Sequence, residues 1–318
     1  MWPFSRTVKP TDLETFRRDL ARAWGVRALI DWTARPFVKE KAFVAGVFSK
    51  IAYLVLPDYE LADHSVVKPI PCFTYQELLS RRQPFDLRTF LKSAEVDTLN
   101  LFVLSTDHAV AVGVARPEVI LVALRGTRPT YMGDWWIDAK AGHRRLMVGG
   151  HRCVFHAGFY DAVNEFLPAL ANWIRDYGAR QRDRPPVYVV GHSLGGAMTA
   201  IVGALDGLSV LAAGDAISTQ RPHLGVHSAY TFGMPRYGDK SVIANLPRPF
   251  HTYSPLDIVP CLPTNSIGFA DCDTEYCLDT RGLTQVVSRP ARGLTTVIQR
   301  IDVRNHFMDH YVEQLARP

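Results

Sequence analysis

The most constraining feature of the sequence is a run of glycines around one serine, Ser193. Residues 191–196 read Gly-His-Ser-Leu-Gly-Gly, and they lie between an apolar run at 187–190 and a stretch of small residues that begins at Ala197. The apolar run predicts a buried strand, and the small residues predict a helix. Side chains at positions 191 and 195 would collide with the crossing strand and helix, so glycine is expected there. We therefore expect a strand, a sharp turn and a helix, with Ser193 held in strained geometry at the turn.

A serine placed in this way is typical of a nucleophile elbow, in which the hydroxyl attacks a carbonyl carbon. Such a serine needs a base, an acid that orients the base, and N–H donors for the oxyanion. In elbow enzymes the acid and then the histidine follow the serine along the chain. Asp257 comes just after a predicted strand, and the last two histidines are His306 and His310. Asp257 is thus the candidate acid, and the residues alone leave both histidines open as the base.

Strands and helices alternate over most of the chain. Short apolar runs, several rich in β-branched residues, predict buried strands at 101–104, 109–112, 119–124, 187–190, 228–232 and 250–254. Helical patterns run over 158–177, onward from Leu194 and over 306–315. This alternation favours an α/β fold, with a mostly parallel central sheet and helices on both faces.

The first 95 residues follow a different pattern. Residues 10–55 predict helix, with a capping box at 11–14 and apolar residues at helical spacing after it. We interpret residues 1–95 as an N-terminal helical extension or cap that is not an independent domain, and residues 96–318 as the catalytic domain. Four arginines, Arg17, Arg18, Arg22 and Arg27, lie opposite the apolar residues of the first helix. A solvated Arg face on a docked helix is favoured over a helix lying on anionic lipid.

The composition is that of a globular protein with a mildly basic surface. Of the 318 residues 47% are hydrophobic, and the formal net charge is +5. These values exclude a disordered or collagen-like chain. A positive charge suits either nucleic acid or a lipid headgroup surface. Because the arginines are spread and no nucleic-acid motif is present, we expect no nucleic-acid partner.

Three observations bear on the compartment. The five cysteines are too few and too scattered for a disulfide framework. The chain begins with polar and charged residues rather than the apolar segment of a secretory signal. The longest apolar stretch, at 42–56, is interrupted by Lys50 and falls short of the about 20 residues that span a bilayer. We expect a cytoplasmic protein, or one at the periphery of a membrane or lipid surface.

Two places in the sequence carry residue types that bind metal ions in other proteins. His306 and His310 are four residues apart and would share a helix face, but Phe307 stands where a zinc protease needs glutamate. Asp271, Asp273 and Glu275 alternate in one segment without the glycine and spacing of an EF-hand loop, so we expect a solvated acidic loop. We predict no metal and no cofactor.

Four further segments resemble the class 3 lipases, the fungal-type triacylglycerol lipase group of the α/β-hydrolase fold. They are residues 123–127 (Ala-Leu-Arg-Gly-Thr), 134–135 (Asp-Trp), 156–159 (His-Ala-Gly-Phe) and 231–238 (Thr-Phe-Gly-Met-Pro-Arg-Tyr-Gly). Each segment alone is modest evidence, but their joint order with the serine turn is specific. The second segment falls where the family has its lid, and Trp135 and Trp136 belong either to a lid or acyl-binding surface or to the core.

The resemblance implies roles for five residues. Ser193 is implied as the nucleophile, Asp257 as the orienting acid and His306 as the general base. His306 is preferred over His310 because family members often have a tyrosine five residues after the histidine, and Tyr311 stands there. The backbone N–H groups of Thr127 and Leu194 are implied as the oxyanion hole, with the Thr127 hydroxyl as a third donor.

The resemblance also implies an activity. We expect a serine hydrolase that cleaves carboxylic esters of lipids, of triacylglycerol or partial-glyceride type, through an acyl-enzyme intermediate. A phospholipase A1, a soluble-ester carboxylesterase and an acyltransferase use the same residues and stay open. A lipid-binding scaffold with an inactive site is the non-enzyme alternative, and the intact set of Ser193, Asp257 and His306 speaks against it. The expected partners are a lipid or ester substrate and, peripherally, an anionic lipid surface.

Overall fold

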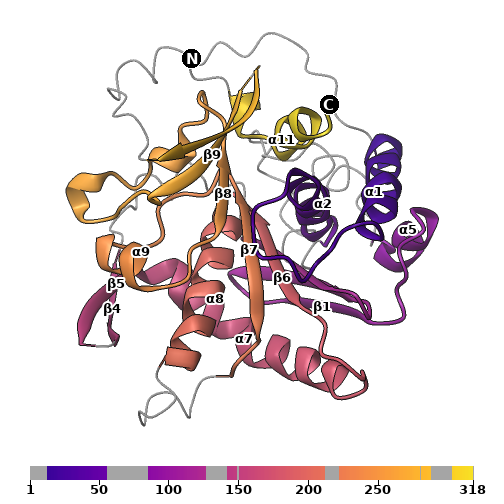
Figure 1. The fold of residues 1–318 in the computed structure, drawn as a ribbon, viewed down its shortest axis with the longest axis horizontal. Coiled ribbons are helices and arrows are strands. Elements are labelled where there is room, and N and C mark those ends of the chain that lie inside the picture. Colours follow the sequence, from indigo (N-terminus) through magenta and orange to yellow (C-terminus); the bar gives the residue numbers. More distant parts are fainter. Residues whose placement is uncertain are drawn as a thin grey trace.

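The computed structural model describes residues 13–55, 85–126, 142–148, 150–211, 222–279, 281–287 and 303–317. Within these residues eight strands form one sheet, in the order β1-β2-β3-β6-β7-β8-β9-β10 (Figure 1). The strands are β1 (Leu101–Ser105), β2 (Ala109–Ala115), β3 (Ile120–Gly126), β6 (Val187–His192), β7 (Val226–Phe232), β8 (Phe250–Tyr253), β9 (Thr274–Asp279) and β10 (Gly282–Val287). A separate antiparallel pair consists of β4 (His143–Val148) and β5 (His151–His156).

The centre of the large sheet is parallel and its two edges are antiparallel. β3, β6, β7, β8 and β9 pair in parallel, whereas β1, β2 and β3 pair antiparallel at one edge and β9 and β10 at the other. β2 and β6 are buried along their whole length. Such continuous burial is expected of strands that are covered on both faces. The predicted α/β fold with a mostly parallel sheet is therefore confirmed.

Helices cover both faces of the sheet. The helical segments are α1 (Leu13–Arg27), α2 (Lys39–Ser49), η1 (Lys50–Leu54), α5 (Leu87–Ser93), α7 (Ala157–Gly178), α8 (Leu194–Leu211), α9 (Lys240–Asn245), η4 (Val259–Cys261), η5 (Asn265–Ile267), η6 (Val303–His306) and α11 (Met308–Leu315). Figure 1 shows α7 and α8 on one side of the sheet and α1, α2 and α11 on the other. Alternate residues of β6 serve the two layers, because successive side chains of a strand point to opposite faces. Val189 packs with α7 and α8, and Val190 packs with α2.

The N-terminal extension forms part of the central packing. α2 and α8 lie on the same three strands, β3, β6 and β7, from opposite faces. Residues 41–49 of α2 are all buried, and Phe48 is only 1% exposed. The extension thus shares one hydrophobic cluster with the sheet, which supports our proposal that residues 1–95 do not form an independent domain.

One of the four arginines predicted to be solvated is buried. Arg18 and Arg22 are exposed, but Arg27 is 6% exposed and lies against Glu118. Its guanidinium carbon is 4.2 Å from the ring centroid of Trp24. The helical spacing alone could not reveal this burial, because the ion partner comes from a turn that is remote in sequence.

The predicted acidic loop around residues 271–277 is also wrong in part. Residues from Thr274 onward form strand β9, which pairs with β8 and β10, and Glu275 is 1% exposed. Asp271 forms an ion pair with Arg236, with Oδ1 and Nε 2.7 Å apart. The carboxylates obscured the alternation of a strand that lies between β8 and β10. The β4 and β5 pair was not predicted either.

No helix within the described ranges is long and apolar enough to span a membrane.

Truncating a side chain that packs α2 against the sheet should destabilise the whole chain. We expect Phe48→Ala to lower the free energy of unfolding by about 3–5 kcal/mol, because it leaves a cavity between α2 and the sheet. Leu29→Ala is the control, since Leu29 is 87% exposed, and it should change that free energy by less than about 0.5 kcal/mol. Urea titrations followed by circular dichroism give both values. Two separate unfolding transitions would contradict the proposal that the extension folds with the sheet.

Candidate active site

Ser193 occupies a strained turn between β6 and α8. Its backbone φ is +56°, in the left-handed region that residues other than glycine rarely adopt. The Ser193 N–H donates to the Phe232 carbonyl, with N and O 3.0 Å apart. A Cβ on Gly191 would lie 2.3 Å from the Gly195 carbonyl oxygen, and one on Gly195 would lie 2.0 Å from the Leu124 oxygen. The predicted steric need for glycine at both positions is therefore confirmed.

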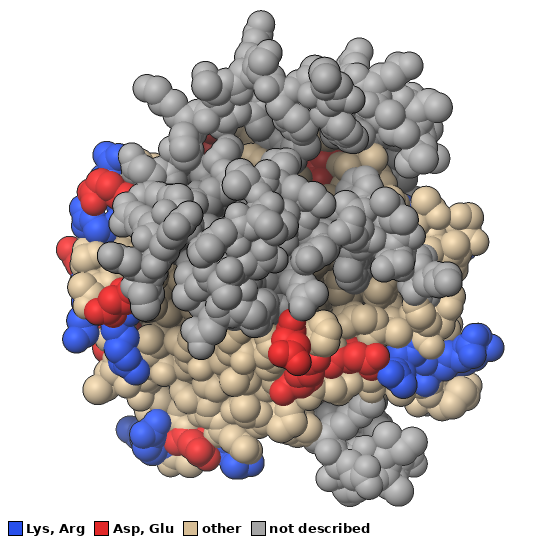
Figure 2. Space-filling view, turned by 180° about the vertical axis from the view of Figure 1, so that it is seen from behind, with Lys and Arg blue, Asp and Glu red and all other residues tan. Residues whose placement is uncertain are grey.

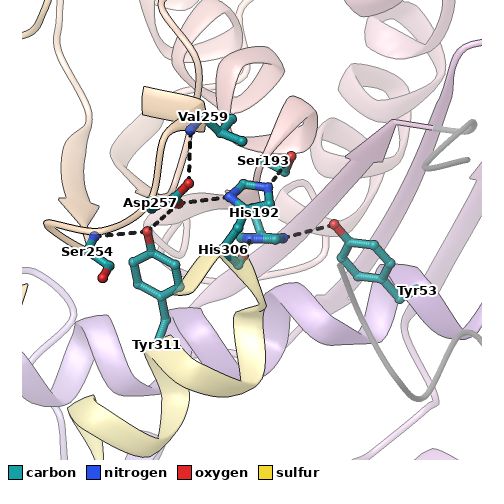
Figure 3. Close-up of polar contacts among 8 residues, drawn as sticks. All are labelled: Tyr53, His192, Ser193, Ser254, Asp257, Val259, His306 and Tyr311. Atoms are coloured by element: carbon teal, nitrogen blue, oxygen red, sulfur yellow. Dashed lines mark hydrogen bonds and ion pairs between the residues drawn. The ribbon is translucent and has the colours of Figure 1, made fainter. Parts of the chain in front are cut away.

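His306 connects Ser193 to Asp257. Its Nε2 lies 2.9 Å from Ser193 Oγ, and its Nδ1 lies 2.8 Å from Asp257 Oδ2 (Figure 3). All three residues are nearly buried, with exposed fractions of 3–4%. The imidazole thus bridges a hydroxyl and a carboxylate. This is the geometry in which a histidine takes the serine proton while the acid orients the ring.

The structure therefore brings Ser193, Asp257 and His306 together. Ser193 follows the carboxyl end of β6 and Asp257 follows that of β8, and parallel strands present these ends at one edge. His306 comes from η6, a 3₁₀ turn that precedes α11. The histidine that joins Ser193 Oγ to Asp257 Oδ2 is thus His306.

Further donors fix the Asp257 carboxylate. The Tyr311 hydroxyl donates to Oδ2 at 2.8 Å, and the Val259 N–H donates to Oδ1 at 2.9 Å. The same Tyr311 oxygen accepts a hydrogen bond from the Ser254 N–H at 3.0 Å. With both oxygens engaged, the carboxylate holds Oδ2 toward His306 Nδ1 (Figure 3).

Gly233 makes room for this arrangement. It follows β7 with a φ of +54°. A Cβ at this position would lie 2.7 Å from Asp257 Oδ2 and 3.2 Å from His306 Nδ1. Position 233 lies in the Thr-Phe-Gly run of the sequence, but the run did not indicate its contact with the acid and the base.

His192 is a buried, hydrogen-bonded neighbour of the base. Its Nε2 lies 2.6 Å from the carbonyl oxygen of His306, and its Nδ1 lies 3.0 Å from the Tyr53 hydroxyl. Burial holds the pKa of His192 well below its ordinary value, and the neighbouring His306 lowers this pKa further. The ring is therefore neutral at physiological pH. The sequence indicated a packing residue here and gave no signal for the contact with Tyr53.

The described residues include only part of the predicted oxyanion hole. Leu194 directly follows Ser193 and begins α8. A Cβ on Gly126, at the end of β3, would lie 3.1 Å from the Leu194 Cβ, so the β3 end and the serine turn are in contact. Thr127 follows Gly126 but lies outside the described residues, as do Asp134, Trp135 and Trp136. The roles of Thr127 and Leu194 stay predictions.

No group of three or more histidine, cysteine, aspartate or glutamate residues suited to a metal ion occurs in the part of the chain that the structure describes. His306 and His310 also do not share a helix. His306 ends η6, whereas His310 lies within α11.

Adding one methyl group at position 233 should impair catalysis. We expect Gly233→Ala to lower kcat by about 100-fold, the cost of misplacing catalytic groups by about 1 Å. Gly25→Ala is the matched control, because nothing lies within 4 Å of a Cβ at this helical position. That change should leave kcat intact and stabilise the helix by up to about 1 kcal/mol. Ester hydrolysis and thermal melts measure both effects, and full activity of folded Gly233→Ala would contradict the assigned geometry.

Comparisons with known proteins agree with this site. The family model for lipase (class 3) matches residues 121–267, a range that contains Ser193 and Asp257 and ends before His306. No curated protein matches the chain.

Among solved structures, the chain is similar to a mono- and diacylglycerol lipase from Aspergillus oryzae, with 18% identity and a TM-score of 0.53 over 86% of this chain and 99% of that one. It is also similar to a lipase from Rhizopus microsporus var. chinensis, with 20% identity and a TM-score of 0.50 over 81% of this chain and 86% of that one. At these identities the likeness shows a shared α/β-hydrolase fold. The match to the class 3 lipase model and the serine site together indicate a carboxylic-ester hydrolase that is similar to the class 3 lipases over residues 121–267.

Proposed function

We propose that the protein hydrolyses glyceride esters, either triacylglycerols or partial glycerides, with Ser193 as the nucleophile. The observation that carries this proposal is the hydrogen-bonded sequence from Ser193 Oγ through His306 to Asp257. The family match supports a lipase, and we propose glycerides as its substrate class.

In the first half of the reaction, Ser193 Oγ attacks the ester carbonyl carbon while His306 Nε2 takes the hydroxyl proton. The Asp257 carboxylate stabilises the imidazolium that forms, and it keeps the proton of Nδ1 directed toward itself. The carbonyl oxygen becomes an oxyanion, for which the Leu194 and Thr127 N–H groups are the proposed donors. His306 then returns the proton to the leaving alcohol, and an acyl-enzyme remains on Ser193.

In the second half, water attacks the acyl carbonyl carbon and His306 takes the proton of the water. Collapse of the tetrahedral intermediate releases the fatty acid, and the proton returns to Ser193 Oγ. An alcohol in place of water would give transesterification, which is why an acyltransferase uses the same residues.

One observation supports a glyceride substrate. The similar Aspergillus oryzae protein is described as a mono- and diacylglycerol lipase.

Hydrolysis of p-nitrophenyl esters and of defined tri-, di- and monoacylglycerols tests this function. We expect Ser193→Ala to lower kcat by at least about 10⁴-fold, because the nucleophile is removed. Ser93→Ala is the control, since this exposed serine lies in α5 and its hydroxyl donates to the Phe90 carbonyl. His306→Ala should lose as much activity as Ser193→Ala, whereas His310→Ala should retain most of it.

Three outcomes would revise the proposal. Unimpaired hydrolysis by Ser193→Ala would contradict the nucleophile. Cleavage of phospholipids or of short soluble esters in preference to glycerides would favour the phospholipase A1 or carboxylesterase alternative. A wild-type protein that binds lipid and hydrolyses none of these esters would favour the inactive scaffold.

We also propose a peripheral contact with anionic lipid surfaces, in keeping with the net charge of +5. On the face drawn in Figure 2, Lys and Arg side chains lie beside Asp and Glu side chains in mixed groups. Mixed charge attracts an anionic surface less than a patch of one sign does, so we expect weak contact. The cytoplasmic location stays a prediction.

Vesicle sedimentation measures this contact. We expect more binding to vesicles with anionic lipid than to neutral vesicles at about 0.01 M salt, and little difference at about 1 M salt, because salt screens exposed charges. Binding that is equal for both vesicle types and independent of salt would contradict an electrostatic contact.

A further inference from the structure

A 3₁₀ turn of the N-terminal extension, η1, contacts the segment that carries the base. Lys50 and Tyr53 are three residues apart in this turn, and side chains at that spacing in a 3₁₀ helix lie on one face. Lys50 reaches Asp309, and Tyr53 reaches His306 through His192. Both residues lie outside the range that matches the lipase family model.

The contact through His192 has a defined direction. A carbonyl oxygen can only accept a hydrogen bond, so His192 Nε2 carries the proton that it shares with the His306 carbonyl at 2.6 Å. Because His192 is neutral, its Nδ1 is then an acceptor, and the Tyr53 hydroxyl must be the donor at 3.0 Å. The Tyr53 hydroxyl therefore holds the ring whose Nε2–H contacts the backbone of the base, and its donated proton suits the tautomer that the His306 carbonyl selects (Figure 3).

This neutral ring also faces the ring of the base. The centroids of His192 and His306 are 4.7 Å apart. A proton on His192 Nδ1 would place a positive charge beside the imidazolium that forms on His306 during catalysis, and like charges at this distance repel. A hydroxyl that donates to Nδ1 favours the uncharged ring.

The contact between Lys50 and Asp309 holds the other end of the short segment 306–309. Lys50 is 1% exposed, and its Nζ lies 2.5 Å from Asp309 Oδ1. Its ammonium lies 4.5 Å from the ring centroid of Phe16, a residue of α1. Asp309 belongs to the first turn of α11, the helix that also carries Tyr311. η1 thus contacts both the histidine and the helix that follows it.

We propose that Tyr53 and Lys50 are positioning residues for catalysis, which hold residues 306–309 so that the His306 ring faces both Ser193 and Asp257. The inference rests on the proposed function, because it assumes that His306 is the base. It gives the extension a role in the reaction besides covering the sheet. Neither residue is expected to touch substrate.

The test compares removal of the Tyr53 hydroxyl with removal of a second buried hydroxyl, that of Tyr188. Tyr188 also joins the sheet to the extension, since its hydroxyl donates to the Trp32 carbonyl at 2.7 Å and accepts from Lys41 Nζ at 3.0 Å. Tyr188 lies near the start of β6, whereas His192 ends that strand at the active site. Tyr53→Phe and Tyr188→Phe therefore each remove one buried hydroxyl that links the same two parts of the fold.

Hydrolysis of a p-nitrophenyl ester is measured for each variant, and the rate is divided by the number of sites that react with a fluorophosphonate. Counting reactive sites removes the effect of any unfolded fraction. We expect Tyr53→Phe to lower kcat per site about tenfold with KM changed less than about twofold, because the lost contact orders the base rather than the substrate. Tyr188→Phe should leave both constants at the wild-type values.

An unchanged kcat per site in Tyr53→Phe, or an equal loss in Tyr188→Phe, would overturn the inference. If Tyr53→Phe does not fold, the double variant Lys50→Met with Asp309→Asn replaces it, and the same criteria apply. Wild-type protein without esterase activity or phosphonate labelling would instead refute the proposed function. The two failures are therefore distinguishable.

Discussion

The arrangement of the active site depends on the direct packing of the α8 backbone against the β3 backbone at the serine turn. A Cβ on Gly195 would lie 2.0 Å from the Leu124 oxygen, so no other residue type allows this approach. The contact forces the chain to reverse within one residue, and Ser193 takes the left-handed φ of +56° as a result. Strain of about 1–3 kcal/mol at such a residue persists only where the surrounding fold determines it. Here α8 is held to β3, β6 and β7 by a continuous apolar cluster.

The parallel sheet then supplies the remaining groups at the same edge. Ser193, Gly233 and Asp257 each follow the carboxyl end of a strand, at β6, β7 and β8 in turn. His306 reaches this edge from the C-terminal part of the chain, 113 residues after Ser193. On the face of the sheet opposite to α8, α2 and η1 share one apolar cluster with α11, the helix that follows His306. The extension and the catalytic histidine are therefore neighbours, although they are far apart in sequence.

Much of this could be predicted from the sequence, because local patterns specify it. The glycines at 191 and 195 indicate the turn, the apolar runs indicate the strands, and the order serine, acid, histidine indicates the partners of Ser193. The burial of two charged residues could not be predicted. Arg27 and Glu275 look solvated in any local window, and they are buried only because tertiary neighbours cover them and, for Arg27, supply an opposite charge.

The contacts of Tyr53 and Lys50 with the site were missed for a related reason. Each joins residues that are more than 130 positions apart, and neither lies in a recognisable motif. Gly233 lies in the Thr-Phe-Gly run at 231–233, yet its contact with Asp257 and His306 arises from the sheet order rather than from its neighbours in sequence. Periodicity and motif spacing describe one segment at a time, whereas these contacts depend on which segments the fold brings together.

We infer that the fold makes one serine, Ser193, reactive. Peptide mapping by mass spectrometry after brief exposure to a p-nitrophenyl alkylphosphonate tests this inference. We expect a single adduct on Ser193 in the native protein, and none in protein that has been unfolded in urea, because His306 and Asp257 must be in place to activate the hydroxyl. An adduct on another residue, or equal labelling of Ser193 in native and unfolded protein, would contradict it.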